Sequence, residues 1–221
     1  MSEYPILFSG EMVKAILARK KTQTRRVINN VPEWCTLIEK ANAVFGEHRP
    51  WPREPPKNWT FVNNDRSRVR QIDCPQEPGD RLWVKEKCAI GFNDDSDLVV
   101  DYHADGKRRW FDATPENQRY ADRYINDDWR RSARFMPHWA SRITLEVVNV
   151  RAERLKGISE EDAKAEGVTA SGGWNADDTE YSVGYRTAFS RLWDSINGKR
   201  YPWSENPWTW VIEFKPVEVK S

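Results

Sequence analysis

The first 28 residues combine strand-like and helix-like patterns of hydrophobic positions. The segment 4–9 predicts a short strand, and a helix is expected to begin near Gly10. Ser9 can cap this helix, because its hydroxyl can accept a hydrogen bond from an early backbone amide. The β-prone segment 22–28 follows, so a second strand is expected there. The apolar face of the predicted helix holds Met12, Val13, Ile16 and Leu17.

Alternating apolar positions predict three further strands. The segment 81–86 follows a Pro-Gly-Asp turn and places Trp83 on the face opposite its aliphatic neighbours. In the segment 141–150 the alternation changes phase after Val147, which predicts a β-bulge. The segment 208–214 alternates large apolar residues with smaller or polar ones and predicts the last strand.

Two more helices are predicted in the C-terminal half. One follows Ser159, whose Ser-Glu-Glu-Asp sequence fits a capping box, and it is expected to end at Glu166 with Gly167 just beyond it. The other spans 183–196, where aromatic and aliphatic residues share one helical face. The segment 169–180 between them is rich in Gly, Ser and Asp and predicts a loop.

Two long segments, 29–77 and 88–137, show no such periodicity and are rich in Pro, Asn, Arg and Trp. Both are too long for ordinary connections, so we interpret them as insertions with some structure of their own, with 115–135 partly helical. The periodic remainder suffices for four or five strands and three helices. The prediction is a single α+β domain over 1–221, formed by a small, partly closed β-barrel with short helices and two large irregular insertions.

The overall composition excludes several classes of protein. The chain has 35 basic and 34 acidic residues, a formal charge of +1, which argues against a polybasic nucleic-acid binder. No apolar run is long enough for a transmembrane helix, and the N-terminus lacks the pattern of a signal peptide. The three cysteines form no C-x-x-C motif, and the three histidines show no metal-ligand spacing. We therefore expect free thiols, a reducing cytoplasmic location, no membrane contact, no metal and no cofactor.

A local excess of positive charge lies near the N-terminus, where residues 1–30 hold six basic and two acidic residues. The segment 19–26, Arg-Lys-Lys-Thr-Gln-Thr-Arg-Arg, brings hydroxyls next to an ammonium and guanidinium groups. Lys21 could activate a threonine hydroxyl as a base, and Arg26 could bind a phosphate or carbonyl through two hydrogen bonds. The alternative is a solvent-exposed basic turn that only ends the helix.

This segment resembles the signature of the ASCH family, a branch of the PUA-like β-barrels. The family pattern is roughly G-x-K-x-x-x-x-R, and this chain has Lys21 and Arg26 at the matching positions with Arg19 in place of the glycine. The Gly-Asp turn at 79–80, the capped helix after 158 and the aromatic strand at 210–214 follow the same family order. The chain looks most like the larger ASCH proteins of phages and prophages.

The resemblance implies a function and a set of site residues. Small bacterial ASCH proteins include an amidohydrolase that removes the acetyl group from N4-acetylcytidine, and its catalytic residues match Lys21, Thr24 and Glu166. Thr24 would be the nucleophile, Lys21 the base and Glu166 the proton shuttle. The end of a helix disfavours a negative charge, which suits a shuttling carboxyl at Glu166. The candidate substrate-binding residues are Arg26, Thr22, Arg19, Arg25, Trp83 and Glu86.

Two other functions stay open. The cations could bind RNA or DNA phosphates without catalysis, or the protein could be a metal-dependent ribonuclease, although no acidic cluster accompanies the signature. The partner expected in every case is a modified nucleoside, RNA or DNA.

Ten of the 12 tryptophans fall into two groups. Those on periodic elements are expected in the core: Trp83, Trp193, Trp208 and Trp210. Those in irregular segments either stack on bases or form small hydrophobic clusters: Trp34, Trp51, Trp59, Trp110, Trp129 and Trp174. Arginines flank Trp110 and Trp129, which is typical of base-stacking sites.

Overall fold

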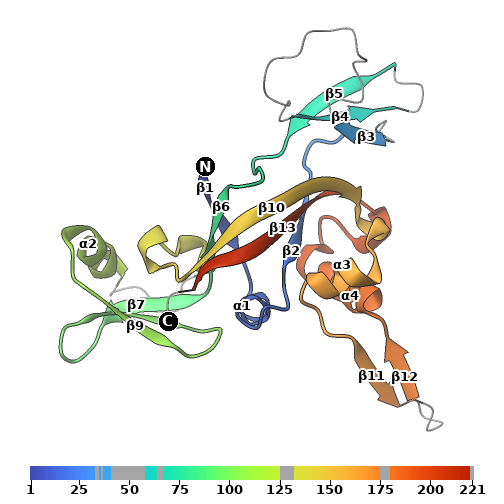
Figure 1. Cartoon of the computed structure of the whole chain (residues 1–221). Coiled ribbons are helices and arrows are strands. Elements are labelled where there is room, and N and C mark those ends of the chain that lie inside the picture. Colours follow the sequence, from blue (N-terminus) through green and yellow to red (C-terminus); the bar gives the residue numbers. More distant parts are fainter. Residues whose placement is uncertain are drawn as a thin grey trace. The chain divides into compact units, whose positions relative to one another are not determined.

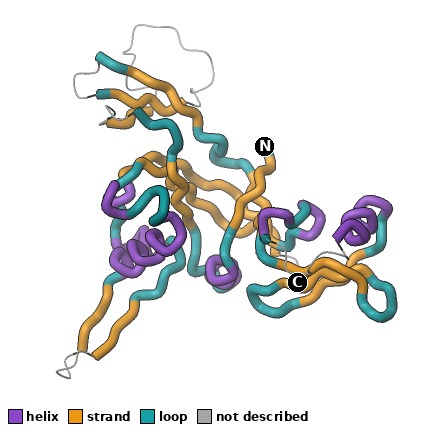
Figure 2. The backbone as a smooth tube through the Cα atoms, turned by 180° about the vertical axis from the view of Figure 1, so that it is seen from behind, coloured by secondary structure: helices purple, strands orange, loops and turns teal. Residues whose placement is uncertain are grey.

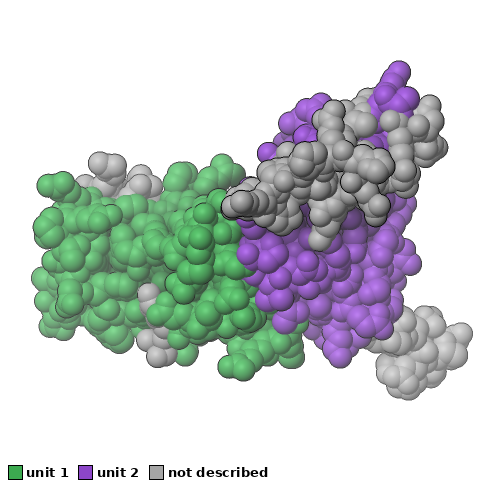
Figure 3. All heavy atoms as spheres, turned by 45° about the horizontal axis from the view of Figure 1, so that its top comes forward, with its two compact units in different colours: residues 1–21, 79–146, 214–221 green, residues 22–78, 147–213 purple. Residues whose placement is uncertain are grey.

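A computed structural model describes residues 1–32, 35, 37–40, 58–63, 67–124, 132–174 and 180–219. The chain divides into two compact units (Figure 3). Unit 1 comprises Met1–Lys21, Gly79–Glu146 and Phe214–Ser221, and unit 2 comprises Thr22–Pro78 and Val147–Glu213. Both units contain helices and strands, which confirms the α+β class.

Unit 1 contains the predicted N-terminal strand and helix. β1 (Glu3–Leu7) pairs in parallel with β6 (Arg81–Lys85), and β6 pairs antiparallel with the start of β10 (Ile143–Arg154). α1 (Gly10–Leu17) begins after Ser9, whose hydroxyl accepts a hydrogen bond from the Met12 amide at 3.4 Å. The alternation along these elements buries one face in a core that includes Ile6, Val13, Ile16, Leu82, Val84, Ile143 and Leu145.

The second predicted insertion is more regular than expected. β7 (Cys88–Phe92), β8 (Leu98–Tyr102) and β9 (Arg108–Phe111) form a three-stranded antiparallel sheet, followed by α2 (Pro115–Tyr124) and two single turns of 3-10 helix, Ala133–Phe135 and His138–Ala140. The prediction of an irregular segment is therefore wrong for 88–111, whereas the helix confirms the expected helical part. Strands of four or five residues are too short to produce a clear period. One hydrophobic cluster of this sheet consists of Cys88, Val100 and Tyr102, packed with Met136 and Ala140.

Unit 2 begins within the basic signature, at Thr22. β2 (Gln23–Val27) pairs antiparallel with the first half of β13 (Trp208–Val219). α3 (Glu160–Ala165) begins at the capping Ser159 and is followed by Gly167 with φ of 85°, as the sequence predicts. α4 (Tyr185–Asn197) packs against α3, and short 3-10 turns lie at Leu155–Gly157 and Trp203–Glu205. The core between these elements holds Leu155, Ile158, Ala163, Phe189 and Trp193.

Two further sheets of unit 2 were not predicted (Figure 2). β3 (Leu37–Lys40), β4 (Asn58–Val62) and β5 (Val69–Asp73) form an antiparallel sheet within the first expected insertion. β11 (Ser171–Trp174) and β12 (Glu180–Val183) form a hairpin where a loop was expected. The Gly-rich composition of this hairpin gives no strand signal, because backbone pairing rather than side-chain pattern holds it together.

The largest sheet has the strand order β1-β6-β10-β13-β2, with β10 and β13 as long central strands (Figure 1). Among the described strands, β1 and β2 form the two edges of this sheet, so the sheet is open. The expected partly closed barrel is therefore not seen in the described part of the chain. The alternation of buried residues along β10 changes phase between Val147 and Val150, where the sequence pattern also changes phase. No helix in the described ranges is both long enough and apolar enough to cross a membrane.

Candidate functional site

The basic signature begins at the C-terminal end of α1, in a turn that brings the chain back toward the helix. The amide of Arg19 donates to the carbonyl of Ile16 at 2.9 Å, and the amide of Lys20 donates to Ala15 at 2.8 Å. These two bonds form a Schellman motif, in which the residue after the cap is left-handed. Arg19 occupies that position with φ of 56°. Arg19 therefore adopts the backbone conformation that glycine usually occupies at this point of a helix end.

Lys21 ends unit 1 and is completely buried. Its side chain has 0% exposure, and its ammonium lies 5.6 Å from the ring centroid of Phe8. Its amide donates to the carbonyl of Ala15 at 3.1 Å, which holds it against the end of α1. A fully buried lysine is rare in proteins and points to a specific role. Arg19, Lys20 and Thr22, by contrast, are exposed.

The next residues of the signature, in unit 2, are buried as well. Gln23, Thr24 and Arg25 on β2 are each no more than 3% exposed. The amide of Thr22 donates to the carbonyl of Ala165 at 2.8 Å, which places the start of β2 beside the end of α3. The alternative interpretation, a solvent-exposed basic turn, is therefore wrong for the four buried residues Lys21, Gln23, Thr24 and Arg25.

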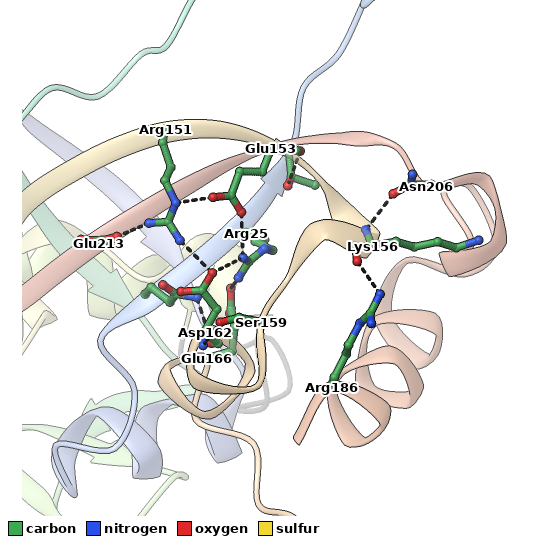
Figure 4. Close-up of polar contacts among 12 residues, drawn as sticks. Arg25, Arg151, Glu153, Lys156, Ser159, Asp162, Glu166, Arg186, Asn206 and Glu213 are labelled. Atoms are coloured by element: carbon green, nitrogen blue, oxygen red, sulfur yellow. Dashed lines mark hydrogen bonds and ion pairs between the residues drawn. The ribbon is translucent and has the colours of Figure 1, made fainter. Parts of the chain in front are cut away.

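Arg25 lies at the centre of a partly buried ionic cluster (Figure 4). Its Nη1 atom lies 3.2 Å from a carboxylate oxygen of Glu166. Its Nη2 atom lies 3.2 Å from Glu153 on β10 and 3.0 Å from Asp162 on α3. The Arg25 side chain is 0% exposed, and its Nε atom is buried without a hydrogen-bond partner among the described residues. One guanidinium thus binds three carboxylates.

A second arginine continues this cluster toward the surface. Arg151 on β10 pairs with Glu153, with Asp162 at 2.9 Å and with Glu213 on β13. Burial acts to lower the pKa of Arg151, but the hydrogen bond to Glu153 and the charges of Glu153 and Asp162 outweigh burial and raise it. Gln23 adds a hydrogen bond from Nε2 to the carbonyl of Asp162 at 2.9 Å. Four carboxylates thus share two guanidinium groups.

Glu166 links this cluster to the catalytic residues expected from the family. It caps the C-terminal end of α3 and is 4% exposed. Burial lowers the pKa of Arg26, and the negative charge of Glu166 acts to raise it. The carboxylate of Glu166 therefore interacts electrostatically with the guanidinium of Arg26. The structure therefore brings Glu166 together with Arg25 and Arg26. Thr24, which lies between Gln23 and Arg25 on β2, is buried.

Two candidate substrate-binding residues lie in unit 1 with other partners. Glu86 is 1% exposed, and both its oxygens accept hydrogen bonds from Arg142, at 2.7 and 2.8 Å. Burial lowers the pKa of Arg142, but hydrogen bonds to Glu86 and Asp105 outweigh burial and raise it. Trp83 is half-buried, with His138 at 5.0 Å between ring centroids. Glu86 thus has a charged protein partner, as Arg25 does.

The tryptophans confirm the core prediction in part. Trp193 and Trp210 are buried, whereas Trp83 and Trp208 are half-buried. The guanidinium of Arg154 lies over the ring of Trp208, 4.4 Å from the ring centroid.

The tryptophans of the expected insertions have different surroundings. Trp59 contacts Trp210 at 5.6 Å between centroids, as in a local hydrophobic cluster, and Trp110 is 62% exposed. Trp34, Trp51 and Trp129 lie outside the described residues, as does the side chain of Trp174.

Sequence reasoning missed the residues that surround Arg25. Glu153, Asp162 and Arg151 belong to no recognised motif. The only signal for a cluster is the Arg-x-Glu spacing at 151–153, just beyond the predicted strand 141–150, because residues two apart share one face if the strand continues. The cysteines that the structure describes are free and buried. In the described ranges, no group of three His, Cys, Asp or Glu residues is arranged to hold a metal ion.

Comparison with known proteins gives no match to this chain among protein-family models, curated proteins or solved structures. The ASCH resemblance therefore rests on the sequence motifs alone.

Proposed function

We propose that this protein is a larger ASCH-type, PUA-like amidohydrolase that cleaves an N4-acyl group from a modified cytidine. The observation that supports this most strongly is the burial of Lys21, Gln23, Thr24 and Arg25. Burying four polar residues in a run of five is unfavourable unless they are paired or needed for chemistry. A basic segment with only a solubilising role would leave these side chains in water.

In the proposed reaction, Thr24 attacks the carbonyl carbon of the N4-acyl group. Lys21 accepts the hydroxyl proton, and a C–O bond forms between Thr24 and the acyl group. Glu166 passes this proton from Lys21 to the exocyclic nitrogen as the C–N bond breaks, which releases cytidine and leaves an acyl ester on Thr24. Water then hydrolyses this ester, so that the products are cytidine and the free carboxylic acid.

The environments of these residues support their roles. Lys21 is completely buried, and it precedes Thr24 by three residues in the chain. Arg26 is half-buried near Glu166, and its guanidinium could stabilise the negative charge on the acyl oxygen as the tetrahedral intermediate forms. Arg25 instead has three carboxylate partners, so we assign it to holding Glu166 in place rather than to binding substrate.

The direct test is the release of cytidine from N4-acetylcytidine by the purified protein. We expect turnover by the wild type, a loss of at least about a hundredfold in Lys21→Ala, and little change in Lys14→Ala. Lys14 is a matched control because it lies on α1, the helix just before Lys21, with its side chain 53% exposed and paired with Glu11.

Failure to cleave this compound and other N4-acylated cytidines, in a protein that unfolds cooperatively, would reject the amidohydrolase proposal. Salt-dependent binding to RNA or DNA without any cleavage would favour a non-catalytic binding module instead. RNA cleavage that a chelator abolishes would favour a ribonuclease.

A further inference from the structure

The exposed part of the signature contains a residue with an unfavourable backbone conformation. Arg19 is a long charged residue in the left-handed conformation, with φ of 56°. L-residues other than Asn, Asp and Gly are disfavoured there because Cβ approaches the backbone carbonyl. In the described ranges the other non-glycine residues with positive φ are Asn30, Ser96 and Asn206, all with short polar side chains. Arg19 therefore adds strain that a glycine would avoid.

The side chain of Arg19 gains no described contact in return. No described residue forms a hydrogen bond or an ion pair with the side chain of Arg19 or Lys20, and both residues are exposed. The nearest acidic residue on α1, Glu11, already pairs with Lys14 at 3.0 Å. Backbone strain without a compensating contact in the protein suggests a role in binding.

The position of these cations relates them to the proposed reaction. Consecutive Cα atoms are 3.8 Å apart, so the Cα of Arg19 lies within about 7.6 Å of the Cα of Lys21, well within the reach of an arginine side chain. A free acylated cytidine is neutral and gives two cations nothing to pair with. A nucleotide carries a phosphate, which a guanidinium binds through two charge-assisted hydrogen bonds.

We propose that Arg19, assisted by Lys20, binds the phosphate of the substrate, so that the protein acts on an acylated cytidine nucleotide rather than on the free nucleoside. This inference rests on the proposed function. The phosphate could belong to a nucleoside monophosphate or to an RNA strand, since both present the same phosphate ester to the guanidinium.

Arg19→Gly distinguishes the effect of the left-handed turn on stability from the contribution of the arginine side chain to substrate binding. We expect the melting temperature to rise by about 2–4 °C, because glycine relieves the left-handed strain. We expect the ratio of kcat/KM for N4-acetylcytidine 5′-monophosphate to kcat/KM for N4-acetylcytidine to fall by about ten- to a hundredfold, the size of one charged hydrogen-bond interaction. A short RNA with one N4-acetylcytidine, measured in parallel, distinguishes the two phosphate sources.

Ser96→Gly is the matched control. Ser96 has φ of 69° in the turn between β7 and β8, so its replacement relieves comparable strain away from the signature. It should raise the melting temperature and leave the substrate ratio unchanged. An unchanged ratio in Arg19→Gly would overturn the inference.

The two proposals fail in different ways. If the wild type cleaves none of the three substrates, the proposed function fails, and binding of the acetylated RNA at low salt then tests the phosphate site by itself. Weaker binding by Arg19→Gly than by Ser96→Gly would support the phosphate site, and equal binding would overturn it.

Discussion

The guanidinium of Arg25 and the carboxylate of Glu166 form a buried ion pair at 3.2 Å, although 141 positions separate the two residues in the chain. Arg25 enters this contact from β2, and Glu166 enters it from the end of α3. The pair fixes the carboxylate expected to move a proton next to the strand that carries Thr24. The ion pair therefore connects the stability of unit 2 to its proposed chemistry.

Replacing Arg25 tests this connection. Arg25→Met should lower the free energy of unfolding by about 3–5 kcal/mol, because it leaves Glu166 and its neighbouring carboxylates without their shared cation. Chemical denaturation in urea measures the change. Arg108→Met is the control, since Arg108 forms an exposed pair with Asp101 at 2.6 Å and its loss should leave the free energy of unfolding almost unchanged. Equal losses in the two variants would contradict a central role for Arg25.

The pair of Glu86 and Arg142 allows a double-mutant cycle in unit 1. Glu86→Leu and Arg142→Met should each cost about 3–5 kcal/mol, because each leaves a buried charge without its main partner. The double variant should lose less than the two single losses together, with a coupling of about 1–3 kcal/mol. Strictly additive losses, measured by urea unfolding, would show that the two side chains do not depend on each other.

Local signals in the sequence predicted several elements closely. Ser9 and Ser159 each precede a helix because a short hydroxyl side chain caps free backbone amides. Gly167 ends α3 because the left-handed conformation there suits a residue without a side chain. The long strands β10 and β13 alternate over enough residues to give a clear period. In these cases the information lies within one element and its immediate neighbours.

Features that depend on pairing between distant segments could not be predicted. The sheet of β7, β8 and β9 has strands of four or five residues, too short for periodicity to separate them from loops. The partners of Arg25 come from β10 and α3, so the cluster exists only once the register of β2 and the position of α3 are fixed. The motif could point to Lys21, Thr24 and Glu166, but not to the carboxylates of Glu153 and Asp162.

Alkaline pH should destabilise the protein through Cys88. Burial raises the pKa of the Cys88 thiol to about 12, with a further rise from Glu86 and a smaller opposing effect from Arg142. The unfolded chain therefore releases this proton above about pH 8.5 while the folded chain retains it, and stability falls as pH rises, by up to about 1.4 kcal/mol per pH unit.

Cys88→Ala should make the loss of stability between about pH 9 and pH 11 shallower than in the wild type. Cys74→Ala should have a smaller effect, because burial raises the pKa of Cys74 only to about 11. Urea unfolding at several pH values gives the slopes. Identical slopes for the wild type and Cys88→Ala would show that Cys88 does not carry this dependence.

The most direct test of the account is the rate of cytidine release from N4-acetylcytidine by two variants of Thr24. Thr24→Ser keeps the hydroxyl and should retain a substantial part of the wild-type rate. Thr24→Val has nearly the same shape without the hydroxyl and should lose at least about a thousandfold in kcat/KM, as expected for loss of a nucleophile. Turnover by Thr24→Val at the wild-type rate would contradict the proposed reaction.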